Sequence, residues 1–434
     1  MNPYLSHPGH AALTSLEKGI PPLEGTLPIA RVGEQEWSLL REDLPLPAAL
    51  IRASALHHNS AWMQNFLSAS GALHAPHGKT TMSPALFDLQ LAQGAWAITV
   101  STLQQIQVAR AFGHRRIFLA NQLIGRQAID YVVRELAADP AFELMFLVDS
   151  AANVDALARA ARAAGLIRPL EALVELGYPG GRTGCRTIEE ALALARQVHA
   201  SGGALTLRGI EGFEGLLKGP DSAGTLKRVS DFLDAMVTLA RSCDSERLYG
   251  TGTVILSAGG SAFYDIVVEK LGLARLSAPA AVLVRAGCYI THDSILYVRA
   301  VDALRERNPS LAEMDGGLRP ALEVWAYVQS RPEAEKLIAG LGKRDVSHDD
   351  KPLALAWFRP DAGMTAPMTL SADHVVTGLN DQHCHVSVPA ASPLQVGDMI
   401  GFGISHPCLT FDKWRVLHVV DDDYRVTSSI RTYF

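Results

Sequence analysis

The segment ELMFLVDSAANVDALARAARAAGLIRPLEALVELG, residues 143–177, contains two short apolar runs separated by an alanine-rich stretch. The runs at 143–150 and 170–177 have the length and the residues of buried strands. The stretch between them, 151–165, has the composition of an amphipathic helix and ends at a glycine. A strand, a crossover helix and a second strand form the repeating unit of a parallel sheet.

The same alternation of strand and helix extends through most of the chain. Strands are predicted at 72–79, 96–101, 116–121, 143–150, 170–177, 205–213, 252–260 and 281–290. Helices are predicted between them at 128–138, 151–165, 187–203 and 226–242. This repetition favours an α/β fold of the TIM-type (β/α)8 barrel class over an open doubly wound sheet. The lack of a GxGxxG motif after the first strand also argues against the open sheet.

The pattern changes after about residue 295, where the predicted elements are strands separated by Gly, Pro and Asp clusters. These strands are predicted at 294–304, 321–332, 373–388, 396–404 and 414–430. We therefore expect an N-terminal segment, 1–50, partly packed on a β domain, then a barrel domain, 51–292, and an all-β C-terminal domain, 293–434.

The composition is that of a soluble globular protein, with 48% hydrophobic residues, 19% charged residues and a net charge of −6. No basic face predicts a nucleic-acid partner, and no apolar stretch is long enough to cross a membrane. The five cysteines are scattered and odd in number, and the N-terminus lacks the pattern of a signal peptide. These features predict a cytoplasmic protein without a disulfide framework.

The first predicted strand runs into the segment HAPHGKTTMSP, residues 74–84, which contains Lys79. Active sites of (β/α)8 barrels lie at the C-terminal ends of the strands. A desolvated lysine there can act as an amine nucleophile, most commonly by forming a Schiff base with pyridoxal phosphate. The alternative is an ordinary solvent-exposed lysine, which position alone does not exclude.

The segment SAGGS, residues 257–261, follows the seventh predicted strand, where many barrels bind phosphate. Gly259 and Gly260 would let backbone N–H groups approach an anion, and Ser261 would add a hydroxyl. A tight glycine turn without a ligand is the alternative. The pairing with Lys79 at the same end of the barrel favours the phosphate site.

The predicted β domain contains two clusters of metal-binding residue types. In ISHPCLTFDKW, residues 404–414, His406 and Cys408 are two apart, which places both side chains on one face of an extended segment. Imidazole and thiolate form a zinc-preferring pair, although such spacing also occurs by chance. The cluster DQHCHV, residues 381–386, would supply another ligand, an acid or base, or only an alternating strand.

Together these segments resemble the pyridoxal-phosphate enzymes of the alanine racemase fold class, in the branch of metal-dependent D-serine dehydratases and D-threonine aldolases. PHGKT resembles the segment whose lysine carries the cofactor, and VELGYPGGRTG resembles a strand with an arginine beside the cofactor ring. VRAGCYITHD resembles the RPGxYxxxD stretch between the two domains, and SHPC resembles the metal-binding segment. The resemblance thus implies that Lys79, Arg182, Gly259, Gly260, Ser261 and Tyr289 bind the cofactor, and that His406 and Cys408 bind the metal.

The chain also departs from the family pattern beside the expected site. EGFEGLL replaces the frequent GYxGH, so that Phe213 stands in a tyrosine position and Leu216 in a histidine position. QHC, with His383 and Cys384, replaces the frequent EHG. Both changes bear on the substrate more than on the cofactor.

The resemblance implies a homodimeric lyase that uses pyridoxal phosphate and a divalent metal, with zinc favoured and manganese or magnesium as alternatives. Its substrate would be a D-amino acid with a β-hydroxyl group. Loss of the Cα proton to Lys79 would dehydrate D-serine to pyruvate and ammonia, which is the reading we favour. Cleavage of the Cα–Cβ bond, with His383 as the base, would make the chain a D-threonine or D-3-hydroxyaspartate aldolase. A non-catalytic carrier of pyridoxal phosphate and a metal-only barrel hydrolase are alternatives of other classes.

Overall fold

The computed structural model describes residues 12–314, 316–360 and 362–434. The chain divides into two compact units. The barrel unit comprises residues 64–79 and 90–287, and the β unit comprises the described residues up to 63, together with 80–89 and 288–434. Helices α2 (Ala53–Ser70) and α3 (Pro84–Ala92) contain residues of both units.

The barrel unit contains a sheet of eight parallel strands with the neighbour order β4, β11, β10, β9, β8, β7, β6, β5. The strands are β4 (Leu73–His74), β5 (Ile98–Val100), β6 (Arg116–Gln122), β7 (Glu143–Val148), β8 (Leu170–Leu176), β9 (Leu205–Gly212), β10 (Val254–Ala258) and β11 (Ala280–Val284). Parallel bridging between His77 and Thr99 joins the segment after β4 to β5, which closes the sheet. The predicted (β/α)8 barrel is therefore confirmed.

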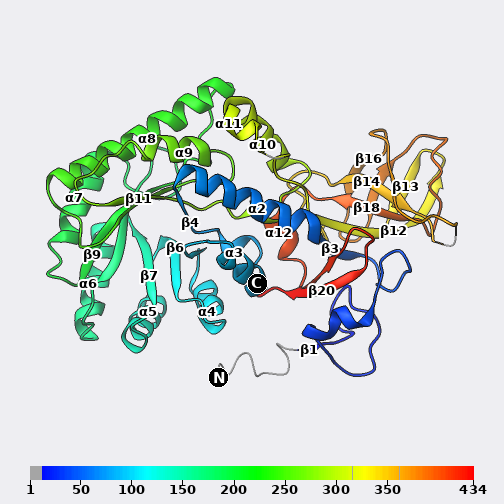
Figure 1. Cartoon of the computed structure of the whole chain (residues 1–434), viewed down its shortest axis with the longest axis horizontal. Coiled ribbons are helices and arrows are strands. Elements are labelled where there is room, and N and C mark those ends of the chain that lie inside the picture. Colours follow the sequence, from blue (N-terminus) through cyan, green and yellow to red (C-terminus); the bar gives the residue numbers. More distant parts are fainter. Residues whose placement is uncertain (1–11, 315, 361) are drawn as a thin grey trace. The chain divides into compact units, whose positions relative to one another are not determined.

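Helices cover the outside of these strands, as Figure 1 shows for α5, α6 and α7 around β7 and β9. The helices of the barrel unit are α4 (Leu103–Ala111), α5 (Arg126–Ala138), α6 (Ala151–Ala163), α7 (Ile188–His199), α8 (Ser222–Ser245) and α9 (Tyr264–Leu271). The start of α7 is fixed locally, because the Thr187 side chain accepts a hydrogen bond from the Glu190 N–H. Glu189 and Glu190 in its first turn and Arg196 in its last turn complement the helix dipole.

The strands bury both faces because the barrel interior is itself a packed core. On β7, Met145 and Leu147 belong to an inner cluster with Phe118, Leu173 and other strand residues. Their neighbours Leu144 and Phe146 are equally buried and point to the opposite face, toward the helices. This explains why the β7 sequence is a continuous apolar run without polar alternation.

The β unit contains a ten-stranded sheet that runs β15, β14, β18, β12, β13, β17, β16, with β3 paired to β12 and β19, and β20 paired to β19. Its strands are β3 (Ala48–Arg52), β12 (Leu322–Glu333), β13 (Lys336–Ala339), β14 (Leu353–Phe358), β15 (Met368–Thr369), β16 (Val375–Leu379), β17 (Cys384–Ser387), β18 (Met399–Gly403), β19 (Val416–Val420) and β20 (Val426–Arg431). Apart from the parallel β3–β19 pair, the pairs within this sheet are antiparallel.

The N-terminal segment contributes to the core of the β unit. It forms the short strands β1 (Ala12–Leu13) and β2 (Leu27–Pro28) and the 3-10 helix η1 (Ile29–Gln35). Its buried apolar side chains, such as Leu13 and Leu39, cluster with Trp325, Met399 and Val416. Residues 1–11 of the predicted segment lie outside the described residues.

One predicted strand is wrong, because most of residues 294–304 form helix α10 (Leu296–Arg307). It is followed by the short helix α11 (Pro309–Ala312). Asp293 stabilises the start of α10, since its carboxylate accepts hydrogen bonds from the N–H groups of Ile295 and Tyr297. The buried residues Val301 and Leu304 are three apart, which is the spacing of a helix face and not of a strand.

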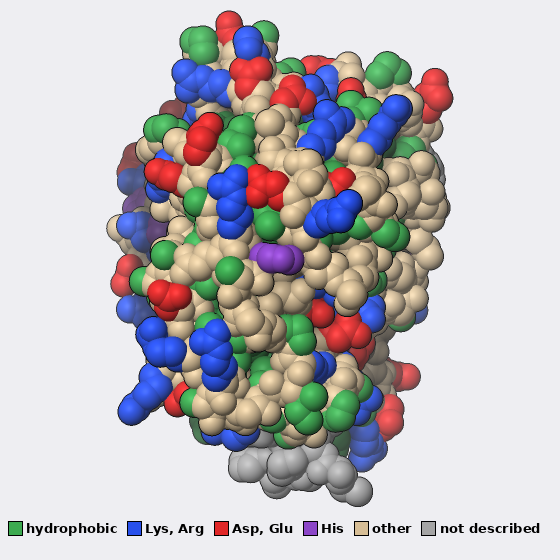
Figure 2. Space-filling model, turned by 90° about the vertical axis from the view of Figure 1, so that its left-hand side faces the viewer, with side chains coloured by type: hydrophobic (Ala, Val, Ile, Leu, Met, Phe, Trp, Pro, Cys, Tyr) green, Lys and Arg blue, Asp and Glu red, His purple; other side chains and the backbone are tan. Residues whose placement is uncertain are grey.

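None of the described helices is both long and apolar enough to span a bilayer. On the face drawn in Figure 2, basic and acidic side chains are interspersed. Ion pairs in the structure reflect this mixing of charge, for example Arg196 with Glu246 at 2.7 Å and Lys227 with Asp231 at 2.7 Å.

Candidate active site

Lys79 directly follows the first barrel strand, in the 3-10 turn η2 (Gly78–Thr80). The strand is short because Pro76 has no N–H to donate, although its carbonyl still accepts from the Thr99 N–H. Lys79 is exposed, whereas the flanking Gly78 and Thr80 are buried. The predicted lysine therefore lies at the C-terminal end of a barrel strand, where barrels place their catalytic groups.

Three buried charged residues lie at the same end of the barrel. Glu175 on β8 and Glu211 on β9 are direct neighbours in the strand register, and Arg285 follows β11. The Arg285 guanidinium donates to the Glu211 carboxylate, and both side chains are almost fully buried. Glu175 accepts hydrogen bonds from Gln122 and from the Thr183 hydroxyl.

Burial controls the protonation of these groups. Burial and the neighbouring Glu211 raise the pKa of Glu175 to about 7. Burial also raises the pKa of Glu211, although Arg285 opposes this. The pKa of His77 is well below its usual value because of burial and then the charges of Lys79, Arg285 and Arg182. Glu175 can thus exchange a proton near neutral pH, while His77 stays neutral.

The predicted phosphate loop binds a carboxylate of the chain itself. The N–H groups of Gly259 and Gly260 each donate to Glu214, with N···O distances of 3.0 Å. Glu214 is fully buried. The two N–H groups are thus aimed at an oxyanion, as the glycines predicted, but a phosphate could take them only if this carboxylate moved.

Phe213, which stands in the tyrosine position of the family pattern, packs between the predicted cofactor residues. The Arg182 guanidinium lies 4.5 Å from the centre of its ring. A methyl group on Gly260 would come within 3.2 Å of the same ring. Leu216, in the histidine position, is exposed, so the two departures place apolar groups where relatives often have polar ones.

The β unit brings together three metal-binding side chains. His406 and Cys408 flank the start of α12 (Pro407–Phe411), and Cys288 begins the 3-10 turn η3 (Cys288–Ile290). The potential ligand atoms of the three residues all lie within 4.8 Å of one another. The two sulfurs are 3.6 Å apart. Tyr289, predicted to touch the cofactor, is buried in η3 beside Cys288 in the chain.

Hydrogen bonds hold the members of this cluster in place. His406 Nδ1 is 2.7 Å from Asp349 Oδ2, and its backbone N–H donates to the Ser347 hydroxyl. The Thr80 hydroxyl lies 3.8 Å from Cys288 Sγ and 3.6 Å from Cys408 Sγ. Such outer partners orient the side chains that bind a metal.

The cluster favours one thiolate and one protonated imidazole. The pKa of Cys408 is well below its usual value because the Cys288 thiol and His406 donate to it. The pKa of Cys288 is raised by the same contact and by burial. Cys408 and Asp349 raise the pKa of His406 to about 9, against the effect of burial. A cation at this position would replace the bound protons.

The two histidine- and cysteine-containing segments of the β unit differ from their predicted conformation or lie outside the metal cluster. His406 and Cys408 do not lie on one extended segment, because Pro407 occupies the first position of α12 and turns the chain. His383 lies in the exposed turn between β16 and β17, where its carbonyl accepts from the Asn380 N–H. Among the same cluster, Cys384 is buried and His385 bonds to the Asn380 side chain.

Comparisons with known proteins agree with this architecture. Residues 321–420 match the model of a putative serine dehydratase domain. The chain is 28% identical over 256 residues to D-threo-3-hydroxyaspartate dehydratase of Delftia sp. (strain HT23), covering 58% of the chain and 63% of that protein. It is 26% identical over 225 residues to 3-hydroxy-D-aspartate aldolase of Paracoccus denitrificans (strain Pd 1222), covering 51% and 56%. These alignments span less than two thirds of either relative.

Solved structures match nearly the whole chain. D-threonine aldolase from Filomicrobium marinum superposes with a TM-score of 0.70 and 20% identity over 92% of this chain and 97% of its own. Alanine racemase from Clostridium difficile 630 gives a TM-score of 0.56 and 13% identity over 89% and 98%. The chain has the alanine racemase fold. The resemblance inferred from the sequence motifs is thereby confirmed.

Within this alanine racemase fold, sequence reasoning missed four groups near the predicted sites. Glu175 and Glu211 are acidic residues near the C-terminal ends of apolar strands, which is a signal of function in barrels. Neither Glu214 nor Cys288 lies at the end of an apolar strand, so the local sequence did not indicate a role for them. Their partners are 45 and 120 residues away in the sequence, so only the fold brings them together.

The residues present fit the groups that the fold implies. Lys79 follows a barrel strand, and the Gly259 and Gly260 N–H groups both point at the acidic side chain of Glu214, whose place a phosphate could take if that side chain moved. In the β unit, two sulfurs and an imidazole converge with a carboxylate behind the imidazole, which is a donor set for a thiophilic cation. Lys79 and the two glycines belong to the barrel unit, whereas the three metal-binding side chains belong to the β unit.

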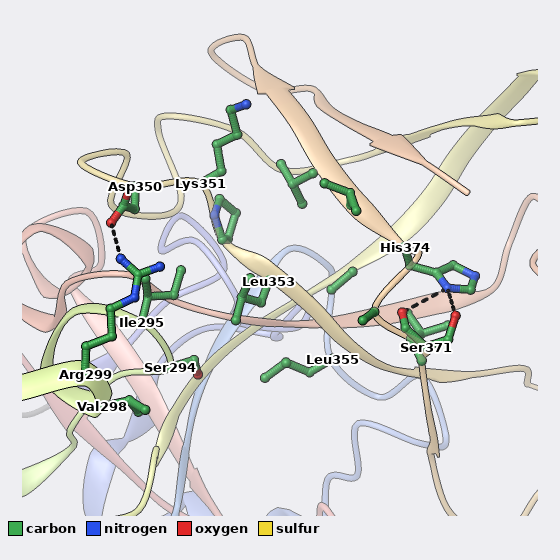
Figure 3. Close-up of a pocket in the computed structure, with 16 residues that line it drawn as sticks. Ser294, Ile295, Val298, Arg299, Asp350, Lys351, Leu353, Leu355, Ser371 and His374 are labelled. Carbon is green, nitrogen blue, oxygen red and sulfur yellow. Dashed lines mark hydrogen bonds and ion pairs between the residues drawn. The ribbon is translucent and has the colours of Figure 1, made fainter. Parts of the chain in front are cut away.

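The β unit also contains a cavity of about 720 Å³ beside the start of α10. Figure 3 shows Arg299 and Asp350 at one end of it, His374 with Ser371 at the other, and Leu353 and Leu355 between them. Arg299 and Asp350 approach to 3.9 Å, and His374 Nδ1 is 3.2 Å from the Ser371 hydroxyl. Each end of the cavity thus contains a pair of polar side chains that contact one another.

Proposed function

We propose that this chain is a lyase that depends on pyridoxal phosphate and a divalent metal and acts on D-amino acids with a β-hydroxyl group. Within this class we propose D-serine dehydration to pyruvate and ammonia as its reaction. The observation that carries the proposal is the convergence of His406, Cys408 and Cys288 in a chain with Lys79 at the end of a barrel strand. The names of the relatives and the domain match support the same class.

The chemistry divides between the groups that bind and the residues that hold them. Pyridoxal phosphate would withdraw electrons from the substrate's Cα, and the metal would polarise the β-hydroxyl group. We assign two tasks to Lys79 Nζ, namely to hold the cofactor and to take up the Cα proton in the dehydration. Arg182, Ser261 and Tyr289 remain our proposed cofactor contacts, together with the glycine N–H groups.

Two titratable residues of the barrel unit have pKa values that are compatible with proton transfer by the Lys79 amine. His77, two residues before Lys79, has a lowered pKa and stays neutral, while Glu175 can buffer a proton near neutral pH. In the β unit, the thiol-rich donor set favours zinc over magnesium or manganese. Because we associate a cysteine ligand with dehydration, these thiol ligands favour our proposal of a dehydratase over that of an aldolase.

Product analysis tests the proposal. The purified chain, loaded with pyridoxal phosphate and zinc, is incubated with D-serine, D-threonine and D-3-hydroxyaspartate. We expect a keto acid and ammonia, with loss of activity in a chelator and in Lys79→Ala. Glycine and an aldehyde would instead show an aldolase, for which His383→Ala gives the matching test of the base.

Cofactor attachment is tested separately from turnover. Borohydride reduction followed by peptide mapping should place a pyridoxyl group on Lys79 and on no other lysine. A labelled Lys79 without turnover of any of the three amino acids would indicate a carrier protein. Metal binding without any label would indicate a metal-only hydrolase and would refute the proposed chemistry.

A further inference from the structure

The sulfur of Cys288 points at the same position as the predicted metal ligands. Its distance to Cys408 Sγ is 3.6 Å, and the ligand atoms of Cys288, His406 and Cys408 all lie within 4.8 Å of one another. Cys288 is buried, and it comes from the turn after the last barrel strand, whereas His406 directly precedes α12 and Cys408 lies in its first turn. Three donors from two separate segments thus face one small volume.

The surroundings distinguish this cluster from an ordinary contact between buried cysteines. Asp349 binds His406 Nδ1, which fixes the ring and leaves Nε2 for the cluster. The Thr80 hydroxyl lies within 3.8 Å of both sulfurs. The Asp349 carboxylate behind the imidazole and the Thr80 hydroxyl beside the two thiols match the second layer of a metal site, and a purely apolar packing role for the cysteines would need neither.

We propose that Cys288 is a third protein ligand, so that two thiolates and one imidazole hold the metal and leave one coordination position open. This deepens the metal-dependent part of the proposed function, on which it rests. A tetrahedral zinc site with three protein ligands and one open position is the arrangement of catalytic zinc. The resemblance by itself implied only His406 and Cys408.

The ligand set has a direct consequence for metal choice. Thiolates select zinc, cobalt or cadmium, whereas magnesium and manganese prefer oxygen ligands. The second thiolate should therefore separate these two groups of metals more strongly than one cysteine and one histidine would.

Cobalt spectroscopy on the full chain tests the number of thiolates. The chain is stripped with a chelator and titrated with Co²⁺, whose near-ultraviolet charge-transfer absorption increases with each bound thiolate. Cys288→Ser and Cys408→Ser should each lose about half of this absorption, as expected for two equivalent sulfurs. Cys384→Ser, which changes a buried cysteine elsewhere in the β unit, should leave it unchanged.

Zinc competition with a chromophoric chelator gives the matching affinities. Cys288→Ser should weaken zinc binding by more than about 10-fold, the lower limit typical of losing an outer partner alone. Asp349→Asn should weaken it by about 10–100-fold without reducing the cobalt charge-transfer absorption. Equal affinity and equal absorption in Cys288→Ser and the unmodified chain would overturn the proposal.

Cadmium NMR of the unmodified chain removes any dependence on how the variants fold. A chemical shift typical of two sulfur ligands supports the proposal, and a shift typical of one sulfur refutes it while leaving the metal-dependent lyase intact. If the chain binds neither cobalt, zinc nor cadmium, both the ligand assignment and the metal-dependent part of the proposed function fail. The borohydride test at Lys79 is independent of all these results.

Discussion

Replacing Arg285 by methionine tests how the buried charges of the barrel are balanced. The Arg285 and Glu211 side chains of this ion pair are only 5% and 2% exposed. Removing one partner of a buried pair typically costs about 3–5 kcal/mol, because the remaining charge loses its counterion. Methionine retains much of the arginine stem, so the loss reflects charge more than volume.

This loss is measurable by urea denaturation followed by circular dichroism. A loss of about 3 kcal/mol lowers the transition midpoint by that free energy divided by the measured m-value, which increases with the surface exposed on unfolding. Adding Glu211→Gln to Arg285→Met should recover part of the loss, since no carboxylate then remains to be neutralised.

An exposed ion pair provides the control for this experiment. Arg196 and Glu246 form a 2.7 Å pair whose side chains are 53% and 36% exposed. Arg196→Met should therefore cost less than about 1 kcal/mol. If Arg285→Met lowers the midpoint no more than Arg196→Met does, the barrel does not rely on Arg285 to neutralise Glu211, and the argument from burial is wrong.

Three further predictions concern pH, helix capping and packing. Because burial raises the pKa of Glu175 from 4.5 to about 7, the native state holds a proton that the unfolded state releases. Stability should fall by about 3 kcal/mol as the pH rises through this interval, and in Glu175→Gln urea midpoints should lack this fall. Asp221→Ala should cost about 1 kcal/mol, since its side chain accepts from the Gly224 N–H at the start of α8, and Asp221→Asn should retain most of this in thermal melts. Phe146→Ala should cost about 3–5 kcal/mol in urea denaturation, as its ring is fully buried on β7, and a loss below that of Asp221→Ala would contradict the packing described for that strand.

The alternation of strands and helices was readable from the sequence because it depends on local periodicity. The β7–α6–β8 segment shows this well, since its strands are continuous apolar runs and its helix has an apolar face. Lys79 was also found locally, from its place after the first strand. The segment 294–304 misled the same reasoning, because a short apolar run suits a strand or a helix, and the caps from Asp293 decide between them.

The sequence by itself thus predicted the barrel, a lysine directly after its first strand and the proximity of His406 to Cys408, all of which are encoded in contiguous residues. Only the tertiary structure placed Cys288 beside Cys408, Glu214 on the Gly259 and Gly260 N–H groups, and Arg285 beside Glu211. Each of these contacts joins residues between 45 and 120 positions apart. Local periodicity carries no information about such pairs, because they depend on which strand ends and turns the closed fold brings together.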